Sequence, residues 1–277
     1  MFKRILGYLF PKTKIKVESW GYFINGTTVE PVADSEYDLV VVDSRDGDGN
    51  LFSTEQVSKM KTRPSGKEKL IVAYISLGEA EDYRPYWKKE WNRNKPSWLG
   101  KENPEWKGNY SIKQWWHSDW INITHSIVDD VINAGFDGVY IDKIDVYSDL
   151  GGTITLRDRM IKYIVDLSKY IKEKKPDFLI IAQNAEELGE NEAYLAAVDG
   201  IGKESVCYSG ELGSKQNKNH PEDINNTIEA LNRFTSADKL VLVVEYVKGA
   251  QYNSALKTLD GNDFVCCSAK KELDKLI

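Results

Sequence analysis

The stretch that decides the fold is residues 135–145, which read Gly-Phe-Asp-Gly-Val-Tyr-Ile-Asp-Lys-Ile-Asp. It predicts a short buried strand that follows a glycine turn and ends on a carboxylate. Because side chains alternate along a strand, Tyr140 and Asp142 share one side and Val139 and Ile141 the other. The apolar pair suits packing against helices, and the tyrosine row suits a barrel interior. Asp142 is then expected at the carboxyl-terminal rim, where α/β barrels keep their active sites.

Similar runs recur along the chain and alternate with helical segments, which is typical of a parallel sheet. The eight predicted strands are residues 20–24, 37–43, 70–76, the run that ends at Asp142, 178–183, 198–204, 240–245 and 264–267. This count favours a single closed (β/α)8 TIM barrel over residues 18–277, since such barrels need about 250 residues. The connection between the first two strands is short, so we expect its helix to be small or missing.

The connecting segments predict the helices and one turn. Helices are expected at 54–61, 124–134, 156–174, 221–235 and 250–259, with a closing helix at 270–277. Residues 46–50, Asp-Gly-Asp-Gly-Asn, resemble the start of a calcium loop. However, Leu51 stands where that loop needs glycine, and no glutamate closes it. A glycine-rich turn is the better interpretation.

A long insertion follows the third strand and ends near residue 123. It contains seven of the eight tryptophans, at positions 87, 91, 98, 106, 115, 116 and 120. Long loops within compact domains are usually functional, and exposed indoles offer flat apolar faces to sugar rings. We expect most of these side chains to form a local core. Trp115 and Trp116 are candidate substrate-binding residues, although on an extended segment only one of them would face a given side.

Composition excludes several classes of protein. The net charge of -6 argues against a nucleic-acid partner, because such proteins carry a basic face. No apolar run reaches the roughly 20 residues that cross a bilayer. The three cysteines fit neither a disulfide framework nor a zinc site. Residues 1–17 could be a clipped signal, a membrane-surface anchor or an arm that packs on the barrel. We favour the arm, with a monomeric protein.

Acidic side chains end many of the predicted strands. The residues expected at the rim are Asp43, Glu79, Asp142, Asp145, Asn184, Glu186, Glu204 and Glu245. Converging carboxylates repel one another and raise their pKa values, which is costly unless a cation, a metal or catalysis uses them. Two carboxylates are the usual machinery of glycoside hydrolysis. Asp142 and Glu204 suit this role, because alternate strands contribute to one layer of a barrel.

Other chemistries have less support from the sequence. No serine stands in a nucleophile elbow, and the three histidines make a multi-histidine metal site a poor fit. Lys143 and Lys203 follow or precede the two candidate catalytic acids, and on strands they should point away from the pocket.

Four motifs carry a family resemblance. Residues 42–47 (Val-Asp-Ser-Arg-Asp-Gly), 73–84 (Ala-Tyr-Ile-Ser-Leu-Gly-Glu-Ala-Glu-Asp-Tyr-Arg), 135–142 and 183–186 (Gln-Asn-Ala-Glu) resemble glycoside hydrolase family 114, the endo-α-1,4-polygalactosaminidases. The resemblance extends over roughly residues 18–268. It implies a (β/α)8 barrel and retaining, endo-acting hydrolysis of cationic galactosamine polymers, which occur in microbial biofilm and fungal cell-wall exopolysaccharide.

By this resemblance, Asp142 is the nucleophile and Glu204 the acid/base, while Asp43, Glu79 and Asn184 line the sugar subsite. The remaining candidate substrate-binding residues are Tyr74, Tyr140, Trp115, Trp116 and Glu245. No cofactor or metal is implied. An acidic mouth would attract the ammonium groups of such a polymer. A polymeric substrate suggests a secreted or cell-surface protein, although no convincing signal peptide is present.

Two alternatives stay open. The first is a non-catalytic barrel that binds an aminosugar through its tryptophan loop. The second is a metal-assisted enzyme in which Asp43, Asp142 and Glu204 hold magnesium. The retaining mechanism predicts carboxyl groups about 5–5.5 Å apart.

Overall fold

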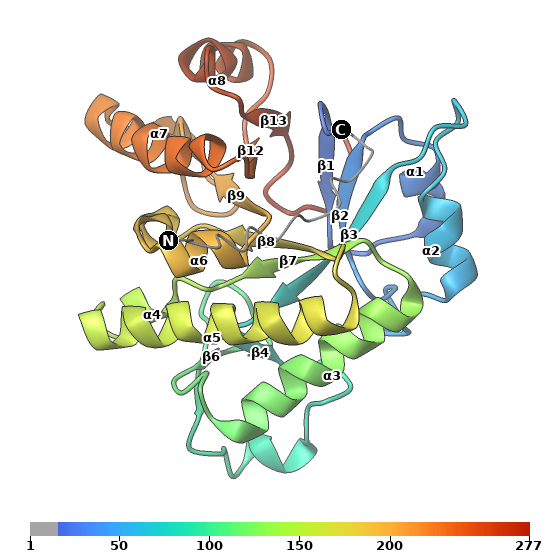
Figure 1. Ribbon diagram of the computed structural model, residues 1–277, viewed down its shortest axis with the longest axis vertical. Coiled ribbons are helices and arrows are strands. Elements are labelled where there is room, and N and C mark those ends of the chain that lie inside the picture. The colour runs from blue at the N-terminus through green and yellow to red at the C-terminus, as the bar shows by residue number, and fades with distance from the viewer. Residues whose placement is uncertain (1–15) are drawn as a thin grey trace, which may run out of the picture.

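The computed structural model describes residues 16–277, and its main feature is one sheet of eight parallel strands (Figure 1). The predicted (β/α)8 fold is confirmed, and each strand lies where the sequence predicts it. In spatial order the strands are β1 (Trp20–Phe23), β2 (Leu39–Asp43), β3 (Leu70–Ser76), β7 (Gly138–Asp142), β8 (Leu179–Gln183), β9 (Gly200–Glu204), β12 (Leu240–Glu245) and β13 (Val265–Ser268).

The barrel is completed at the seam between β1 and β13. Within residues 16–277 no strand ladder joins these two strands, but the Trp20 indole donates to the Val265 carbonyl at 2.9 Å. The amides of Ile24 and Asn25 donate to the Leu273 carbonyl at 3.1 and 3.0 Å. The C-terminal segment therefore covers the edge of β1 and closes the seam.

The predicted closing helix at 270–277 is wrong, because this segment consists of turns. Its polar backbone groups bond to the edge of β1, and Leu273 packs with the barrel interior at 7% exposure. Eight residues are also too few for a helix to be stable without extensive packing.

Helices cover the outside of the barrel. They are α1 (Val29–Ala33), α2 (Thr54–Met60), α3 (Ser118–Ala134), α4 (Val146–Asp149), α5 (Ile154–Lys174), α6 (Glu192–Ala197), α7 (Pro221–Ser236) and α8 (Ala250–Leu259), with 3₁₀ turns at Lys89–Asn92 and Glu186–Glu190. The short α1 agrees with the prediction. Helix α3 begins six residues before the predicted start at Thr124, because the His117 side chain accepts the Asp119 amide as an N-cap and Trp120 packs inward.

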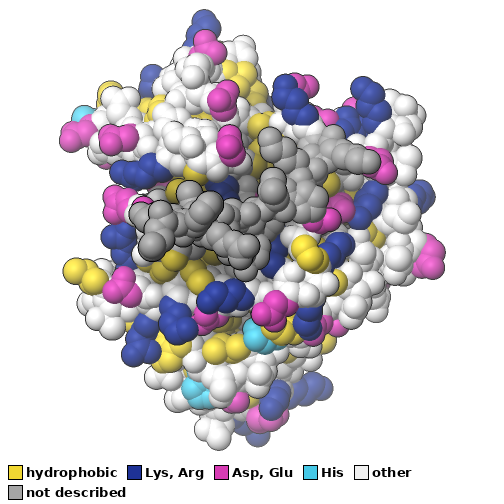
Figure 2. Space-filling view, viewed as in Figure 1, with side chains coloured by type: hydrophobic (Ala, Val, Ile, Leu, Met, Phe, Trp, Pro, Cys, Tyr) yellow, Lys and Arg dark blue, Asp and Glu magenta, His cyan; other side chains and the backbone are white. Residues whose placement is uncertain are grey.

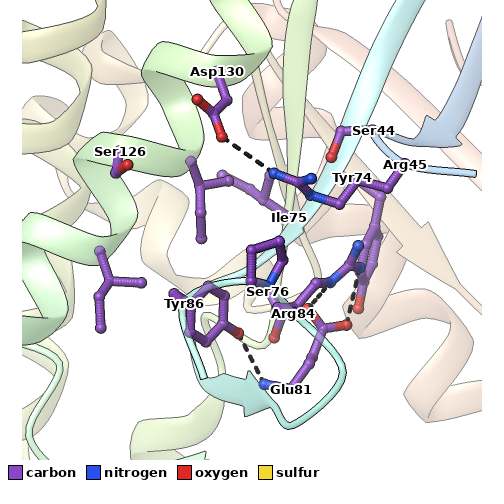
Figure 3. Close-up of a pocket in the computed structure, with 13 residues that line it drawn as sticks. Ser44, Arg45, Tyr74, Ile75, Ser76, Glu81, Arg84, Tyr86, Ser126 and Asp130 are labelled. Atoms are coloured by element: carbon purple, nitrogen blue, oxygen red, sulfur yellow. Dashed lines mark hydrogen bonds and ion pairs between the residues drawn. The ribbon is translucent and has the colours of Figure 1, made fainter. Parts of the chain in front are cut away.

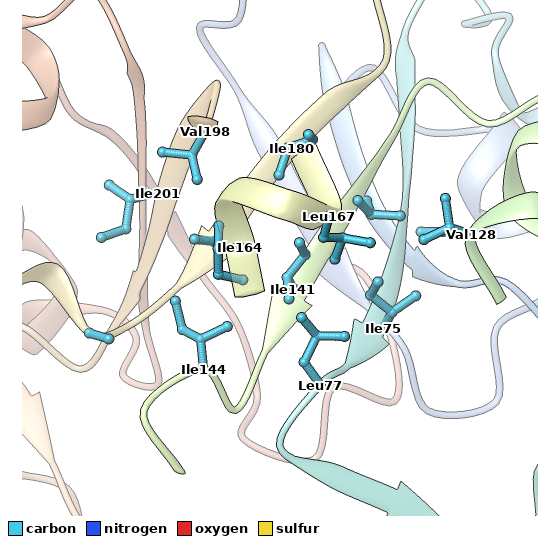
Figure 4. Packing of buried hydrophobic residues seen from close by; sticks show 14 of the residues in the cluster. Ile75, Leu77, Val128, Ile141, Ile144, Ile164, Leu167, Ile180, Val198 and Ile201 are labelled. Carbon is cyan, nitrogen blue, oxygen red and sulfur yellow. The ribbon is translucent and has the colours of Figure 1, made fainter. Parts of the chain in front are cut away.

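Alternation along the strands separates two apolar layers, as the sequence predicts. Tyr140 packs inside the barrel with Leu242 and Val244, whereas Val139 and Ile141 belong to the outer core. Figure 4 shows that outer layer, in which Ile164 and Leu167 of α5 lie over Ile141 of β7 and Ile180 of β8.

Tyr140 reaches across the interior toward β9. A β-carbon on Gly202 would lie 1.9 Å from the Tyr140 hydroxyl oxygen, so only glycine fits there. The glycine row of β9 thus makes room for a tyrosine beneath the rim.

The tryptophan-rich insertion folds as a three-stranded antiparallel sheet outside the barrel, at the lower part of Figure 1. Its strands are β4 (Glu79–Glu81), β5 (Leu99–Glu102) and β6 (Asn109–Ile112). Ring centroids of Trp91 and Trp98 lie 5.2 Å apart, and those of Trp98 and Trp120 lie 5.5 Å apart. The expected local core is confirmed, since these three side chains and Trp115 are buried.

Three smaller findings complete the fold. Residues 46–50 form a turn in which the Asp46 carboxylate accepts the amides of Asp48 and Asn50. The loop after β9 carries a small hairpin, β10 (Tyr208–Ser209) and β11 (Asn217–Lys218). No helix within residues 16–277 has the length and apolar character needed to cross a membrane. The predicted N-terminal arm lies almost wholly outside the described residues.

Candidate active site

A cleft of about 730 Å³ opens at the carboxyl ends of the strands. Acids dominate its charged lining, as the strand ends predict. The acidic side chains are Asp43, Asp46, Asp48, Glu79, Glu81, Glu105, Asp142, Asp145, Glu204 and Glu272, and the basic ones are Arg45, Arg84, Lys107, Lys143 and Lys271. Tyr22, Tyr74, Asn184 and Tyr246 also line it.

Asp142 ends β7 and projects into this cleft. Its Oδ2 accepts the Tyr74 hydroxyl at 2.7 Å, and its Oδ1 accepts the Lys143 amide at 2.7 Å. Burial and the negative charge of Glu204 raise the pKa of Asp142 to about 7, against the lowering effect of the Tyr74 hydrogen bond. The carboxyl group is therefore held by neutral donors only, close to a second carboxylate.

Glu204 ends β9 and is the second carboxylate of the pair. Its Oε2 accepts the Asn184 side-chain amide at 3.2 Å, and its Oε1 accepts the Tyr246 hydroxyl. Tyr246 follows β12, and Asn184 follows β8. Three neighbouring strand ends thus build the environment of Glu204, again with neutral donors.

The backbone turns sharply behind both carboxylates. Lys143, Asn184 and Ser205 follow β7, β8 and β9 directly, and their φ angles are +58°, +58° and +55°. Such angles are uncommon outside glycine, and backbone strain of this kind gathers at functional sites. The geometry ends each strand abruptly at the rim, so that Asp142 and Glu204 stay on the cleft wall.

The two flanking lysines differ from each other. Lys203 pairs with Glu186 at 2.9 Å and does not line the cleft, as its strand position predicts. Lys143 does line the cleft, with its ammonium 3.8 Å from Glu79 Oε1, so its predicted outward direction is wrong. The left-handed backbone at Lys143 breaks the strand alternation on which that prediction rested.

Asp43 lies in the cleft, but both of its oxygens have a cationic partner. Arg84 holds Oδ1 and Oδ2 at 2.8 Å each, and its Nε donates to Glu81 at 2.7 Å. We call Asp43, Glu81 and Arg84 the arginine clamp. Burial raises the pKa of Asp43, while Arg84 opposes that shift. The clamp fastens the insertion to the end of β2.

A smaller cavity of about 220 Å³ lies on the other side of the clamp, between the strand ends and α3. Figure 3 shows its lining, with the contact of Arg84 with Glu81 and the 3.2 Å contact of Arg45 with Asp130. Arg45, Tyr74, Glu81 and Arg84 line both spaces. The clamp is therefore the wall between them.

Glu79 is also engaged by the insertion. Its two oxygens accept the side-chain amides of Asn103 and Asn109 at 2.8 and 3.2 Å. Like Asp43, it faces the cleft with its hydrogen-bonding capacity largely used by the protein.

Four of the predicted substrate-binding residues do not line the cleft. Tyr140 is buried below it, and Trp115 is buried in the insertion core. Trp116 packs under the Arg159 guanidinium, 4.3 Å from its ring centroid. Glu245 is fully buried and accepts the amides of Cys207 and Tyr208 at 2.6 and 3.1 Å.

Strand alternation explains the position of Glu245. It also accounts for Tyr246, a cleft residue that the sequence analysis did not predict. Leu242 and Val244 face the barrel interior, so Glu245 faces outward and Tyr246 faces inward. Counting from the interior residues of β12 would have identified Tyr246. Arg84 lies within a quoted motif, but nothing in that motif indicates its partner on β2.

Within residues 16–277, no three or more His, Cys, Asp or Glu side chains gather closely enough to hold a metal ion. Figure 2 shows one face of the molecule, on which Lys and Arg side chains are interspersed with Asp and Glu side chains.

The model of "Glycoside-hydrolase family GH114" matches residues 9–277. The chain belongs to glycoside hydrolase family 114. This membership confirms the resemblance of the four motifs and identifies the chain as a glycosidase.

Relatives of this family 114 chain occur in distant organisms. An uncharacterized protein of Methanocaldococcus jannaschii, MJ1477, is 39% identical over 268 residues, covering 92% of this chain and 72% of its own. An uncharacterized protein of Deinococcus radiodurans is 33% identical over 269 residues, covering 94% and 83%.

Two solved structures share the fold. Aspergillus fumigatus Ega3, determined in complex with galactosamine, superposes with a TM-score of 0.70 at 16% identity, covering 95% of this chain and 96% of its own. The glycoside hydrolase domain of Pseudomonas aeruginosa PelA gives 0.72 at 12% identity, with coverage of 95% and 98%. The family 114 chain thus has the barrel of both proteins along nearly its whole length.

Proposed function

We propose that the chain is an endo-acting, retaining glycosidase that cleaves α-1,4-linked galactosamine-containing exopolysaccharide. The observation that carries the proposal is the pair Asp142 and Glu204, two carboxylates held by neutral donors in an acidic cleft of a family 114 barrel. The galactosamine bound to the similarly folded Ega3 supports the choice of sugar.

Asp142 is the proposed nucleophile. It would attack the anomeric carbon to form a glycosyl-enzyme, which water then hydrolyses. Glu204 would first protonate the leaving oxygen and then deprotonate that water. Tyr74 and Tyr246 each donate a hydroxyl to one of these carboxylates and fix its orientation.

The pKa of about 7 for Asp142 bears on these roles. In the free protein a large part of Asp142 is therefore protonated at neutral pH. A nucleophile must be ionised. We propose that an ammonium-bearing sugar beside Asp142 stabilises the Asp142 anion, so that the nucleophile is ionised when the substrate is bound.

The acidic cleft has a further role in this proposal. Ten acidic and five basic side chains line it, so a polymer of cationic aminosugars would be attracted and concentrated there. Cleavage should accordingly weaken as ionic strength rises, because salt screens exposed charges.

The proposal is tested by digesting α-1,4-linked galactosamine oligomers, both fully deacetylated and partly N-acetylated, and reading the products by mass spectrometry and NMR. We expect internal cleavage and a first product that keeps the α configuration. An inverted first product would contradict the retaining mechanism, and intact oligomers in the presence of folded protein would contradict the substrate.

The same assay addresses the two alternatives. A non-catalytic barrel would bind the oligomers with undiminished affinity and release no product. A metal-assisted enzyme would lose activity with a chelator and regain it with magnesium. The proposed mechanism uses only side chains, so a chelator should leave the rate unchanged.

A further inference from the structure

Two aromatic side chains stand out on the surface of the insertion. Tyr83 is 58% exposed and Trp106 is 40% exposed, and among residues 16–277 no other Phe, Trp or Tyr side chain is exposed to this degree. Both line the acidic cleft. Exposed apolar surface in a groove often marks a binding site. Two exposed rings on the wall of one cleft are therefore candidates for contact with a ligand.

Tyr83 is held rigidly rather than left free. Its hydroxyl donates to Glu81 Oε1 at 2.6 Å, and the Arg84 guanidinium lies 5.2 Å from its ring centroid. Both partners belong to the arginine clamp. The ring therefore keeps one orientation, and a ligand that stacks on it would lose little conformational entropy in the protein.

The turn 106–109 holds the backbone of Trp106 near Tyr83. The Asn109 amide donates to the Trp106 carbonyl at 3.1 Å, and the Asp82 amide donates to the Gly108 carbonyl at 2.8 Å. Gly108 has a φ of +89°, and a β-carbon there would lie 3.5 Å from Tyr83 Cδ1. The turn thus lies directly against the Tyr83 ring, with Trp106 two residues away.

Neither ring is hydrogen-bonded to the catalytic pair. The hydrogen bonds of Asp142 and Glu204 go to Tyr74, the Lys143 amide, Asn184 and Tyr246. The two exposed rings belong to the insertion and line the same cleft, and Tyr83 bonds to the clamp residue Glu81.

We propose that Tyr83 and Trp106 form an aromatic platform that binds a pyranose ring of the polysaccharide at a subsite away from the bond that is cleaved. The Arg84 cation already lies over the Tyr83 ring. We therefore expect the exposed part of the ring to stack on the C–H face of the sugar and not on its ammonium group. The carboxylate of Glu105, which also lines the cleft, is placed to attract the ammonium of an aminosugar. This inference rests on the proposed function for the identity of the sugar.

The test compares long and short substrates. Tyr83→Ala, Trp106→Ala and Tyr83→Phe are assayed with an α-1,4-galactosamine octamer and with the shortest oligomer that the wild type cleaves. We expect each alanine variant to lower kcat/KM on the octamer about tenfold, through KM, and to change the shortest substrate less than twofold. Tyr83→Phe keeps the ring and should stay within about threefold of wild type. Ile154→Ala removes a 78% exposed apolar side chain outside the cleft and serves as the control.

Calorimetric titration in the Glu204→Gln background separates the two proposals. The octamer should bind at least fivefold more weakly when Tyr83→Ala is added. Equal losses on long and short substrates, or unchanged octamer affinity, would overturn the platform and leave the proposed function standing. If no galactosamine oligomer is cleaved or bound, the same variants are titrated against chitosan and polygalacturonate octamers. Tyr83-dependent binding of either would support the platform and reject the proposed sugar, whereas no binding would overturn both proposals.

Discussion

Two groups of acids at the rim of this barrel look alike in sequence and differ in their surroundings. Asp142 and Glu204 accept hydrogen bonds from tyrosine hydroxyls and amides only. Asp43, in contrast, is held at both oxygens by the Arg84 guanidinium. Within the cleft, the two carboxylates with neutral partners keep their charge available to a ligand, whereas a buried cation neutralises Asp43.

Removing the charge of one acid in each group tests whether the two groups differ in function, and it should give the largest difference in activity. Asp142→Asn should lower kcat/KM on a galactosamine oligomer on the order of 10³-fold or more, because it removes the proposed nucleophile. Asp43→Asn should retain far more activity, and its main effect should be lower stability. Equal losses of activity in folded proteins would contradict the distinction between the two groups.

Breaking the arginine clamp should mainly affect stability. Arg84→Met leaves Asp43 and Glu81 buried without their cation, and removing one partner of a buried ion pair costs about 3–5 kcal/mol. Urea unfolding measures this loss. The Asp43→Asn/Arg84→Met double variant leaves fewer unpaired charges and should recover part of it. A single variant as stable as wild type would show that the clamp does not fasten the insertion.

The raised pKa of Asp142 should appear in the pH dependence of stability. The folded protein binds this proton up to about pH 7, whereas an aspartate in the unfolded chain releases it near pH 4. The contribution to stability is therefore full below about pH 4 and is lost as pH rises through 7.

Asp142→Asn removes this dependence. The free energy of unfolding of Asp142→Asn, relative to that of wild type, should therefore increase from pH 5 to pH 8 by an amount on the order of 1–3 kcal/mol. Thermal melts at both pH values measure the difference. Glu245, whose pKa burial also raises to about 7, keeps part of the slope in both proteins. If this difference in the free energy of unfolding decreased toward pH 8, the raised pKa of Asp142 would be contradicted. In wild-type activity, the acidic limb of kcat/KM should lie near pH 7, because the nucleophile Asp142 must lose its proton before it can attack.

Removing one neutral donor should have the smallest effect on activity among these changes. Tyr246→Phe removes one hydrogen bond to Glu204, and a hydrogen bond to a charged group contributes about 1.5–3 kcal/mol. Because Asn184 still holds the other oxygen, we expect a fall in kcat of about tenfold and a changed pH profile. A loss of stability with an unchanged pH profile would assign Tyr246 a purely structural role.

The strands, their order along the chain and the inward direction of Asp142 and Glu204 could all be predicted, because they follow from alternation and from residues that lie close together in sequence. Tyr246 was within reach of the same argument, and Glu245 was assigned to the wrong side of β12. The partners of Asp43 and Glu79 could not be predicted. Arg84, Asn103 and Asn109 come from an insertion whose strand pairing leaves no simple periodic signal.

The tryptophans illustrate the same limit. The expected local core is present, but which indole remains exposed depends on how the turn 106–109 packs against Tyr83. The C-terminal segment likewise bonds to β1, about 250 residues earlier in the chain, and that contact outweighs its local helical pattern.

Azide rescue distinguishes the nucleophile from the acid/base residue in the pair Asp142 and Glu204. Asp142→Ala and Glu204→Ala are each incubated with an activated α-galactosaminide and azide, and the anomeric configuration of the glycosyl azide is read by NMR. The account predicts a β-azide from Asp142→Ala, because azide attacks the substrate directly in place of the nucleophile. It predicts an α-azide from Glu204→Ala, because azide attacks the glycosyl-enzyme. The reverse pattern would exchange the two roles, and full activity of either folded variant without azide would contradict the pair.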